Sequence, residues 1–212
     1  MFFVELNGFG LNWLTASSAV ILAITTWQYR ATIGQARKIW TKRSAESVSI
    51  TAAVALFFIT AASLYYGIAT RSLVISYTGG LCIPAFFVMW GAWTFGSPAH
   101  RERVIFAAGV TSMLAYSVFP VAWVFTAFAI ATTLPLCAQL RELYKTGKRG
   151  VVHGELLATY VTKNPAIAVF AFVAYEPVYM IFGPVWLGLS IWLLAKWINC
   201  EPSEKSVHSP RV

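Results

Sequence analysis

One tripeptide in the sequence combines residue types that can bind a solute inside a membrane. Lys163, Asn164 and Pro165 stand in the middle of an apolar segment that covers residues 152–174. A lysine at bilayer depth costs at least about 2.5 kcal/mol, so we expect it to face the protein interior or water. Its ammonium group can pair with an anionic group of a solute, and the Asn164 amide can hydrogen-bond the same solute. Alternatively, Lys163 snorkels, or is neutral and hydrogen-bonded, and only ties helices together.

Pro165 also predicts a bend in this segment, because a proline inside a helix leaves the carbonyl group four residues earlier without its donor. Pro135 in the preceding apolar segment and Gly34 at the end of the first one are further candidate hinges. Hinges of this kind allow bundles of helices to rock around a fixed site. The alternative is the ordinary tolerance of proline and glycine in membrane helices.

The composition predicts an all-α membrane protein. Hydrophobic residues make up 58% of the 212 residues, charged residues only 11%, and the mean hydropathy is +0.66. The apolar runs are continuous and do not alternate, which favours membrane-spanning helices over a membrane barrel. The net charge of +8 falls mainly in short loops between the runs. There it sets orientation and meets lipid headgroups, so nucleic acid is not an expected partner.

We expect seven transmembrane helices in a 3+1+3 arrangement. A first three-helix repeat covers residues 12–95, a linker helix residues 104–119, and a second repeat residues 121–198. One long bent helix around Pro120 is the alternative and would give six spans. Residues 199–212 are expected to form a disordered cytosolic tail. The loops on one side are all net positive, which predicts an outside N-terminus and a cytosolic C-terminus.

Two basic junctions indicate that the chain is built twice from one plan. Residues 34–50 read GQARKIWTKRSAESVSI, and residues 135–152 read PLCAQLRELYKTGKRGVV. Displacing the sequence by 104 positions places Gln35 on Gln139, within these junctions. The three spans of the first repeat and the linker span make four crossings of the membrane. The second repeat therefore begins on the same side as the first and has the same orientation. Parallel repeats are a known transporter design, with the solute site between them near the membrane midplane.

These junctions and the helices beside them resemble the PQ-loop superfamily, especially its SWEET branch of seven-helix sugar uniporters. The resemblance covers about residues 12–198 and is strongest in KIWTKRSAESVSI, followed by VALF and LYYGI. Leu134-Pro135-Leu136 and Tyr144-Lys145-Thr146 look like the fifth-helix motif and its loop. The resemblance implies facilitative transport of a sugar across the cell membrane by alternating access between the two bundles.

The resemblance also points to solute-binding positions, although the residues there depart from the family pattern. The paired asparagines that hold sugar fall on or beside Thr78 and Gly183, of which Thr78 can still hydrogen-bond a solute. Trp186 is a further candidate, because aromatic faces stack on sugar rings. The alternatives are a small organic anion or amino acid bound through Lys163, or a receptor or sorting protein that transports nothing.

No catalytic constellation is visible in the sequence, and we expect no enzymatic activity. The histidines and cysteines lack metal-ligand spacing, and no phosphate-binding loop or paired carboxylates occur. The predicted partners are a small-molecule solute and membrane lipid, with a homo-oligomer as a further expectation. Neither a cofactor nor a metal is expected.

Overall fold

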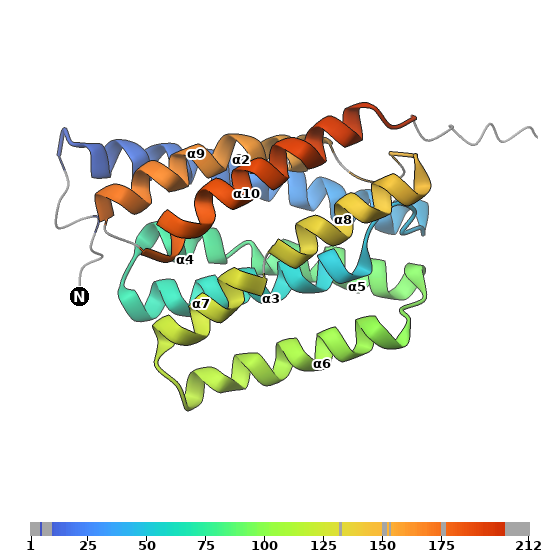
Figure 1. Cartoon of the computed structure of the whole chain (residues 1–212), viewed down its shortest axis with the longest axis horizontal. Helices are drawn as coiled ribbons and strands as arrows, with labels where there is room; N and C mark the ends of the chain where they lie inside the picture. The colour runs from blue at the N-terminus through green and yellow to red at the C-terminus, as the bar shows by residue number, and fades with distance from the viewer. Residues whose placement is uncertain are drawn as a thin grey trace, which may run out of the picture.

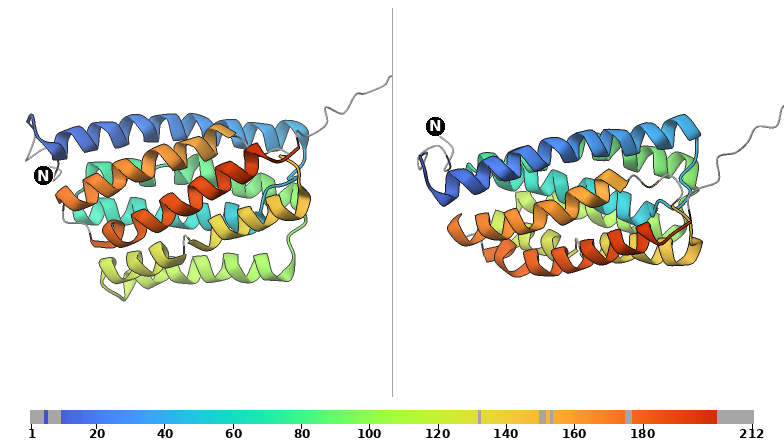
Figure 2. Two further views of the ribbon diagram at one scale, coloured as in Figure 1. Left: turned by 45° about the horizontal axis from the view of Figure 1, so that its top comes forward. Right: turned by 90° about the horizontal axis from the view of Figure 1, so that it is seen from above.

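The computed structural model describes Glu5, residues 10–131 and 133–149, Val152, and residues 154–174 and 177–201. Within these residues the regular structure is helical, apart from an isolated β-bridge between Lys148 and Glu201. The long helices lie side by side along a common axis (Figures 1 and 2). In chain order they are α2 (Trp13–Lys42), α3 (Ile50–Thr70), α4 (Leu73–Gly79), α5 (Cys82–Gly96), α6 (His100–Leu114), the 3-10 helix η1 (Ala115–Ser117), α7 (Val121–Ala131), α8 (Thr133–Thr146), α9 (Gly154–Ala174) and α10 (Pro177–Ile198).

Five stretches of the described chain are long and apolar enough to cross a membrane, which gives the chain the character of an integral membrane protein. They are Ile50–Thr70, Leu73–Gly96, Val121–Thr146, Gly154–Ala174 and Tyr179–Ile198.

Two of the seven predicted spans are not among these five, for different reasons. α6 has 15 residues, which at about 1.5 Å per residue fall short of a hydrocarbon core about 30 Å thick. α2 has 30 residues but carries many polar side chains. Those at Thr25, Gln28, Thr32 and Gln35 are buried. These four uncharged polar side chains therefore lie against other helices, whereas the basic side chains of α2, at Arg30, Arg37, Lys38 and Lys42, are exposed.

The structure corrects the predicted end of the first helix. Asn12 caps α2, because its side chain accepts a hydrogen bond from the Thr15 amide at 2.8 Å. The helix then continues through Gly34 and ends only at Arg43, which has a left-handed backbone with a φ of 47°. The loop to α3 therefore begins nine residues later than predicted, and Gly34 lies inside a helix. α9 likewise continues as a helix through Pro165.

The third predicted span is divided at Gly80 and Leu81 into α4 and α5. The hydroxyl group of Tyr29, on α2, donates to the Tyr77 carbonyl at 3.0 Å. The Leu81 amide bonds to the Thr78 carbonyl instead, in a tighter turn. A Cβ atom at position 80 would overlap the Tyr29 hydroxyl, so a larger residue there would require this hydroxyl group to move. A side chain from another helix thus interrupts this span.

The helices of the two halves pack in the same order. α4 and α5 lie between α2 and α3, and α10 packs against both α8 and α9. Across the halves, α2 packs on α9, while α3 packs on α7 and α8. α6 lies on the outside of this arrangement, against α3 (Figure 1).

The helix boundaries of the two halves are also displaced by a constant number of residues. α3 and α9 both have 21 residues, and each begins and ends 104 positions from the other. The last residues of α2 and α8, and the first residues of α4 and α10, are separated by the same 104 positions. A sequence displacement that aligned two glutamines therefore also aligns helix ends.

The loops with the most positive charge gather at one end of the molecule. The α2–α3 connection, the α5–α6 connection, the end of α8 and the end of α10 lie at that end (Figures 1 and 2). The start of α2 and the turn between α3 and α4 lie at the other end, where Arg71 is the described cation of the turn.

Candidate functional site

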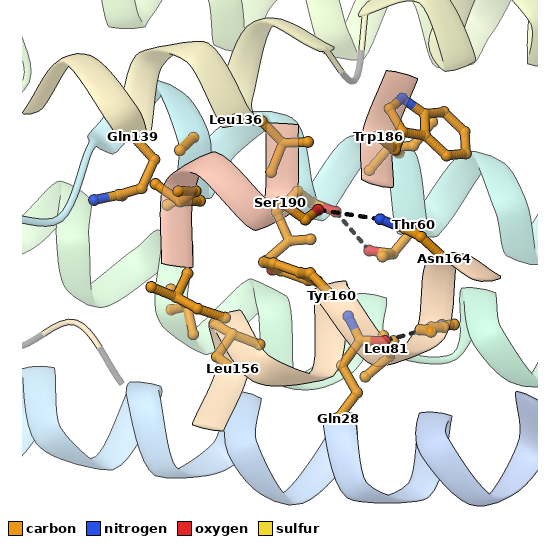
Figure 3. Close-up of a pocket in the computed structure, with 18 of the residues that line it drawn as sticks. Gln28, Thr60, Leu81, Leu136, Gln139, Leu156, Tyr160, Asn164, Trp186 and Ser190 are labelled. Carbon is orange, nitrogen blue, oxygen red and sulfur yellow. Dashed lines mark hydrogen bonds between the residues drawn. The ribbon is translucent and has the colours of Figure 1, made fainter. Parts of the chain in front are cut away.

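A cavity of about 210 Å³ lies between the two halves (Figure 3). Side chains of α2, α3, α4 and α5 line it from one half, and side chains of α7, α8, α9 and α10 from the other. At roughly 30 Å³ per molecule, 210 Å³ corresponds to about seven waters, so the cavity suits a small solute. Apolar side chains make up much of the wall, with a few polar groups among them, as in small-molecule sites generally.

Lys163 is the charged member of this wall. Its side chain is buried, with 5% of its surface exposed. Its Nζ atom donates to Oε1 of Gln28 at 2.9 Å, which joins α9 of the second half to α2 of the first. No other Lys, Arg, Asp or Glu is among the described residues that line the cavity. The ammonium group therefore has a neutral partner there and no carboxylate.

Next to Lys163, Asn164 points toward α10. Its Nδ2 atom donates to Oγ of Ser190 at 3.1 Å, and both side chains are buried (Figure 3). Trp186 lies one helical turn before Ser190 and also lines the cavity. Its indole N–H is buried and has no hydrogen-bond partner in the described part of the chain.

On the side of the first half, Thr78 lines the cavity from α4. Its hydroxyl group lies 3.5 Å from that of Thr25 on α2, and either group can donate. Thr60 and Ser63 of α3 also line the wall. Their hydroxyl hydrogens bond to carbonyl groups of their own helix.

Four predicted solute-binding residues thus meet at one cavity, namely Lys163, Asn164, Thr78 and Trp186. Gly183 does not line it. That residue is buried on α10, and a Cβ atom added there would meet Ala168 of α9 at 3.7 Å. Three further aromatic residues line the cavity, namely Phe125, Tyr160 and Tyr179. Four aromatic residues of the spans are exposed on the surface: Tyr65, Tyr77, Trp90 and Trp192.

The predicted hinge residues lie around the cavity. Pro165 follows Asn164 directly in α9, and its side chain is exposed. Pro135 lies in the first turn of α8, beside the cavity-lining Leu136. Gly34 precedes Gln35, which is buried and lines the cavity from α2.

Sequence reasoning missed two of the polar residues that complete the site. Gln28 and Ser190 are the partners of Lys163 and Asn164, and they lie 135 and 26 residues away along the chain. An amide inside the first apolar run was a usable signal for Gln28, because such a group needs a partner in a membrane. Ser190 offered no such signal, since serine is common in membrane helices.

A second set of contacts joins the halves at the basic end. Gln139 of α8 accepts from the Ser49 amide at 3.1 Å and donates to the Ser47 carbonyl at 2.8 Å. Ser47 also donates its hydroxyl hydrogen to Thr146 at 3.3 Å. The loop between α2 and α3 is therefore held by the last turns of α8. Because Ser49 and Gln139 also line the cavity, these bonds close its wall at this end.

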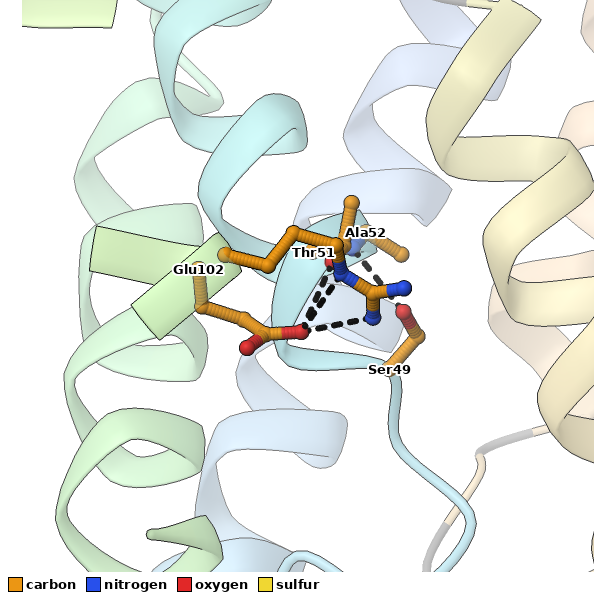
Figure 4. A network of polar contacts seen from close by, with 5 residues as sticks. Ser49, Thr51, Ala52 and Glu102 are labelled. Carbon is orange, nitrogen blue, oxygen red and sulfur yellow. Dashed lines mark hydrogen bonds and ion pairs between the residues drawn. The ribbon is translucent and has the colours of Figure 1, made fainter. Parts of the chain in front are cut away.

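Glu102 fixes the start of α6 to α3 (Figure 4). Its Oε1 atom accepts from the Thr51 hydroxyl group at 3.3 Å and from Arg101 at 2.7 Å, while Oε2 is buried without a partner in the described residues. Burial raises the pKa of the Glu102 carboxyl group. The hydrogen bonds and charge of Arg101, with the Thr51 bond, lower this pKa by more than burial raises it. The net pKa lies below its ordinary value, so the carboxylate is charged at neutral pH.

The fold and the site together define a helical membrane protein with a mainly apolar cavity, which holds a few buried polar groups, between two similar halves. Comparison of the chain with protein-family models, with curated proteins and with solved structures finds no match. The function therefore has to be inferred from the residues and their arrangement, and the resemblance to the PQ-loop superfamily stays a prediction.

Proposed function

We propose that this protein is a facilitative transporter of a small polar solute, with seven transmembrane helices in the 3+1+3 arrangement of the PQ-loop superfamily and its SWEET branch. The first bundle comprises α2 to α5, α6 is the linker helix, and the second bundle comprises α7 to α10. The constant displacement of 104 positions between helix boundaries supports two repeats of one unit. The common packing order of the two halves supports them as well.

The observation that carries the proposal is the position of the polar cavity between the two halves. Buried polar and charged groups are expensive in a membrane and usually mark a solute or ion pathway. In transporters built from repeats, the solute lies between the repeats, and rocking of the bundles exposes it to each side in turn. The bond between Lys163 and Gln28 lies at that interface, so movement of the halves would change it.

The packing of α2 supports its assignment as a membrane-crossing helix despite its low hydropathy. Its polar residues Thr25, Gln28 and Gln35 are buried, whereas Val20 and Ile33 are exposed. A helix in lipid needs its apolar side chains outward and its polar ones inward, as here. Pro135 of α8 and Pro165 of α9 are the proposed points of bending, with Gly34 as a third.

The distribution of charge supports an orientation. Positive residues concentrate in loops at one end of the bundle, and such loops remain in the cytosol. The proposed protein therefore has its N-terminus outside the cell and its C-terminus in the cytosol, in the plasma membrane.

Reconstitution tests the function. The purified chain is placed in liposomes, and uptake of radiolabelled sugars, amino acids and carboxylates is measured without an ion gradient. We expect saturable uptake and counterflow of at least one class, absent from protein-free liposomes. If no member of the three classes moves, the transporter proposal is wrong, and a receptor or sorting role becomes the better hypothesis.

A further inference from the structure

The cavity wall holds a basic side chain but no acidic one among the described residues. Lys163 is buried in its wall, and none of the described lining residues is acidic. A buried ammonium group without a counter-charge is costly, and a solute with one negative charge would offset that cost. We propose that the solute is a small monocarboxylate anion whose carboxylate pairs with Lys163; this rests on the proposed transport function and names its substrate class.

The hydrogen-bonding groups of the cavity agree with an anion. An ionised carboxylate only accepts hydrogen bonds, so its site has to supply donors. Lys163 has three N–H donors, of which one goes to Gln28. The amide of Asn164 uses one donor on Ser190. The indole N–H of Trp186 is buried and uses none within the described chain.

The size and the remaining wall of the cavity admit a short carbon chain. Its volume of about 210 Å³ has room for a few carbon atoms beside a carboxylate group. Beside the polar groups, Ile59, Leu156 and Ile167 provide apolar contacts. A solute of a few carbon atoms with one carboxylate group, such as lactate, satisfies the charge, the donors and the volume together.

Binding of such an anion would also act on the contact between the halves. Nζ of Lys163 donates to the side-chain Oε1 atom of Gln28 across the interface of α9 and α2. A carboxylate is the stronger acceptor, because hydrogen bonds to ionised groups are roughly twice as strong as neutral ones. The anion thus competes with Gln28 for the ammonium group and weakens one tie between the bundles.

A binding experiment tests this inference independently of transport. Thermal unfolding of the purified full chain in detergent is followed with increasing sodium lactate, with its neutral isostere lactamide, and with sodium chloride at equal ionic strength. A ligand that binds only the folded state raises Tm. We expect lactate to raise Tm with saturation, and lactamide and chloride to have little effect.

Variants assign the effect to Lys163. Lys163→Gln should weaken lactate binding by about tenfold or more, the usual loss when a charged hydrogen bond is removed. Lys148→Gln is the matched control, because it removes one positive charge from an exposed residue outside the cavity. If Lys163→Gln does not fold, Gln28→Met replaces it. That variant keeps the ammonium group and removes its competing acceptor, so lactate should bind at least as tightly as to the wild type.

The outcomes separate this inference from the proposed function. Lactate binding that depends on Lys163, without uptake of any solute into liposomes, would support the anion site and reject the transporter. Sugar uptake by a protein that neither binds nor transports lactate would support the transporter and overturn the anion site. Equal lactate binding by the wild type and Lys163→Gln, or loss of lactate binding in Gln28→Met, would also overturn it.

Discussion

α3 and α9 occupy equivalent places in the two halves, yet they present different chemistry to the cavity between them. At the level of the cavity, α3 presents Ile59 and Thr60, and the residues 104 positions later on α9 are Lys163 and Asn164. The Thr60 hydroxyl hydrogen bonds within its own helix, to Leu56. The two side chains of α9 instead bond to α2 and α10.

α3 and α9 therefore share their backbone geometry but differ in the groups that they present to a solute. The length and the boundaries of the two helices are the same, so the frame is shared. Of these two helices, only α9 presents a basic group and an amide to the cavity. We infer that the solute is recognised mainly by α9, while α3 supplies shape.

A second difference lies in how tightly the helices of each half approach. A Cβ atom on Gly79 would overlap the backbone of Leu64, whereas one on its counterpart Gly183 would meet Ala168 at an ordinary 3.7 Å. α4 therefore lies directly on the backbone of α3, but α10 leaves room beside α9. The first half is the more tightly built of the two at this level.

The largest expected effect comes from preventing the halves from separating at the basic end. Ser47→Cys with Thr146→Cys, in a chain whose three native cysteines are replaced by alanine, places two thiols where a 3.3 Å hydrogen bond now joins the halves. Oxidation should abolish uptake of the solutes that the unmodified chain carries, because alternating access requires this end to open. Reduction should restore uptake, and each single variant should be unaffected. Full uptake by the demonstrably cross-linked protein would contradict movement at this interface.

The paired glycines test the difference in packing. Gly79→Ala should lower the free energy of unfolding by about 1 to 3 kcal/mol, because the added methyl group must displace backbone. Gly183→Ala should be neutral, or stabilising by up to about 1 kcal/mol, since alanine favours a helix. Thermal unfolding in detergent measures both variants. Similar losses of stability in the two would mean that the halves are equally tight.

A smaller effect is expected when α9 is made like α3. Asn164→Thr removes the amide that bonds to Ser190 and should weaken lactate binding about fivefold, corresponding to about 1 kcal/mol for one hydrogen bond. Thr60→Val is the control at the same level of the other half, and it should change lactate binding less than twofold. Titration of Tm with lactate gives both values. An effect of Thr60→Val as large as that of Asn164→Thr would remove the proposed asymmetry.

The smallest effect concerns α6. This helix packs on α3 and is bonded to it through Glu102, and within the described chain no helix packs on α9 in the same way. Because the pKa of Glu102 is lowered in the folded chain, its contribution to stability is present above the unfolded value of about 4.3 and is lost as the pH falls through the folded value. Arg101 is mostly exposed, so the contribution should be at most about 1 kcal/mol. Glu102→Gln should reduce the fall in Tm between pH 7 and pH 3.5.

Glu46→Gln is the control for that measurement, because it makes the same replacement at an exposed residue. Its fall in Tm should match that of the wild type. If Glu102→Gln shows the same fall as the wild type, the carboxylate of Glu102 does not stabilise the contact between α6 and α3.

The agreement between sequence and structure differs from element to element. The apolar runs predicted α3, α9 and α10 within a few residues, because their ends coincide with breaks in hydropathy. The first helix was predicted to end about nine residues too early, since its last turns are basic and look like a loop. The break at Gly80 was missed, because its cause is a hydroxyl group on another helix.

The site shows the same division. The charge and amide of Lys163 and Asn164 and the aromatic ring of Trp186 were conspicuous in apolar segments, and the structure places all three at the cavity. Thr78 and Gly183 were predicted from the family resemblance; Thr78 lines the cavity and Gly183 does not, and their role in binding stays a prediction.

The sequence by itself determined the helical membrane character, the displacement by 104 positions that aligns Gln35 with Gln139, and a lysine in the middle of an apolar segment. These follow from composition, periodicity and spacing along the chain, which are local properties. Only the tertiary structure decided that Lys163 meets Gln28 and that no described acidic side chain shares the cavity wall. Partners so far apart along the chain are chosen by helix packing, since the geometry of the bundle sets which buried groups come within hydrogen-bonding distance.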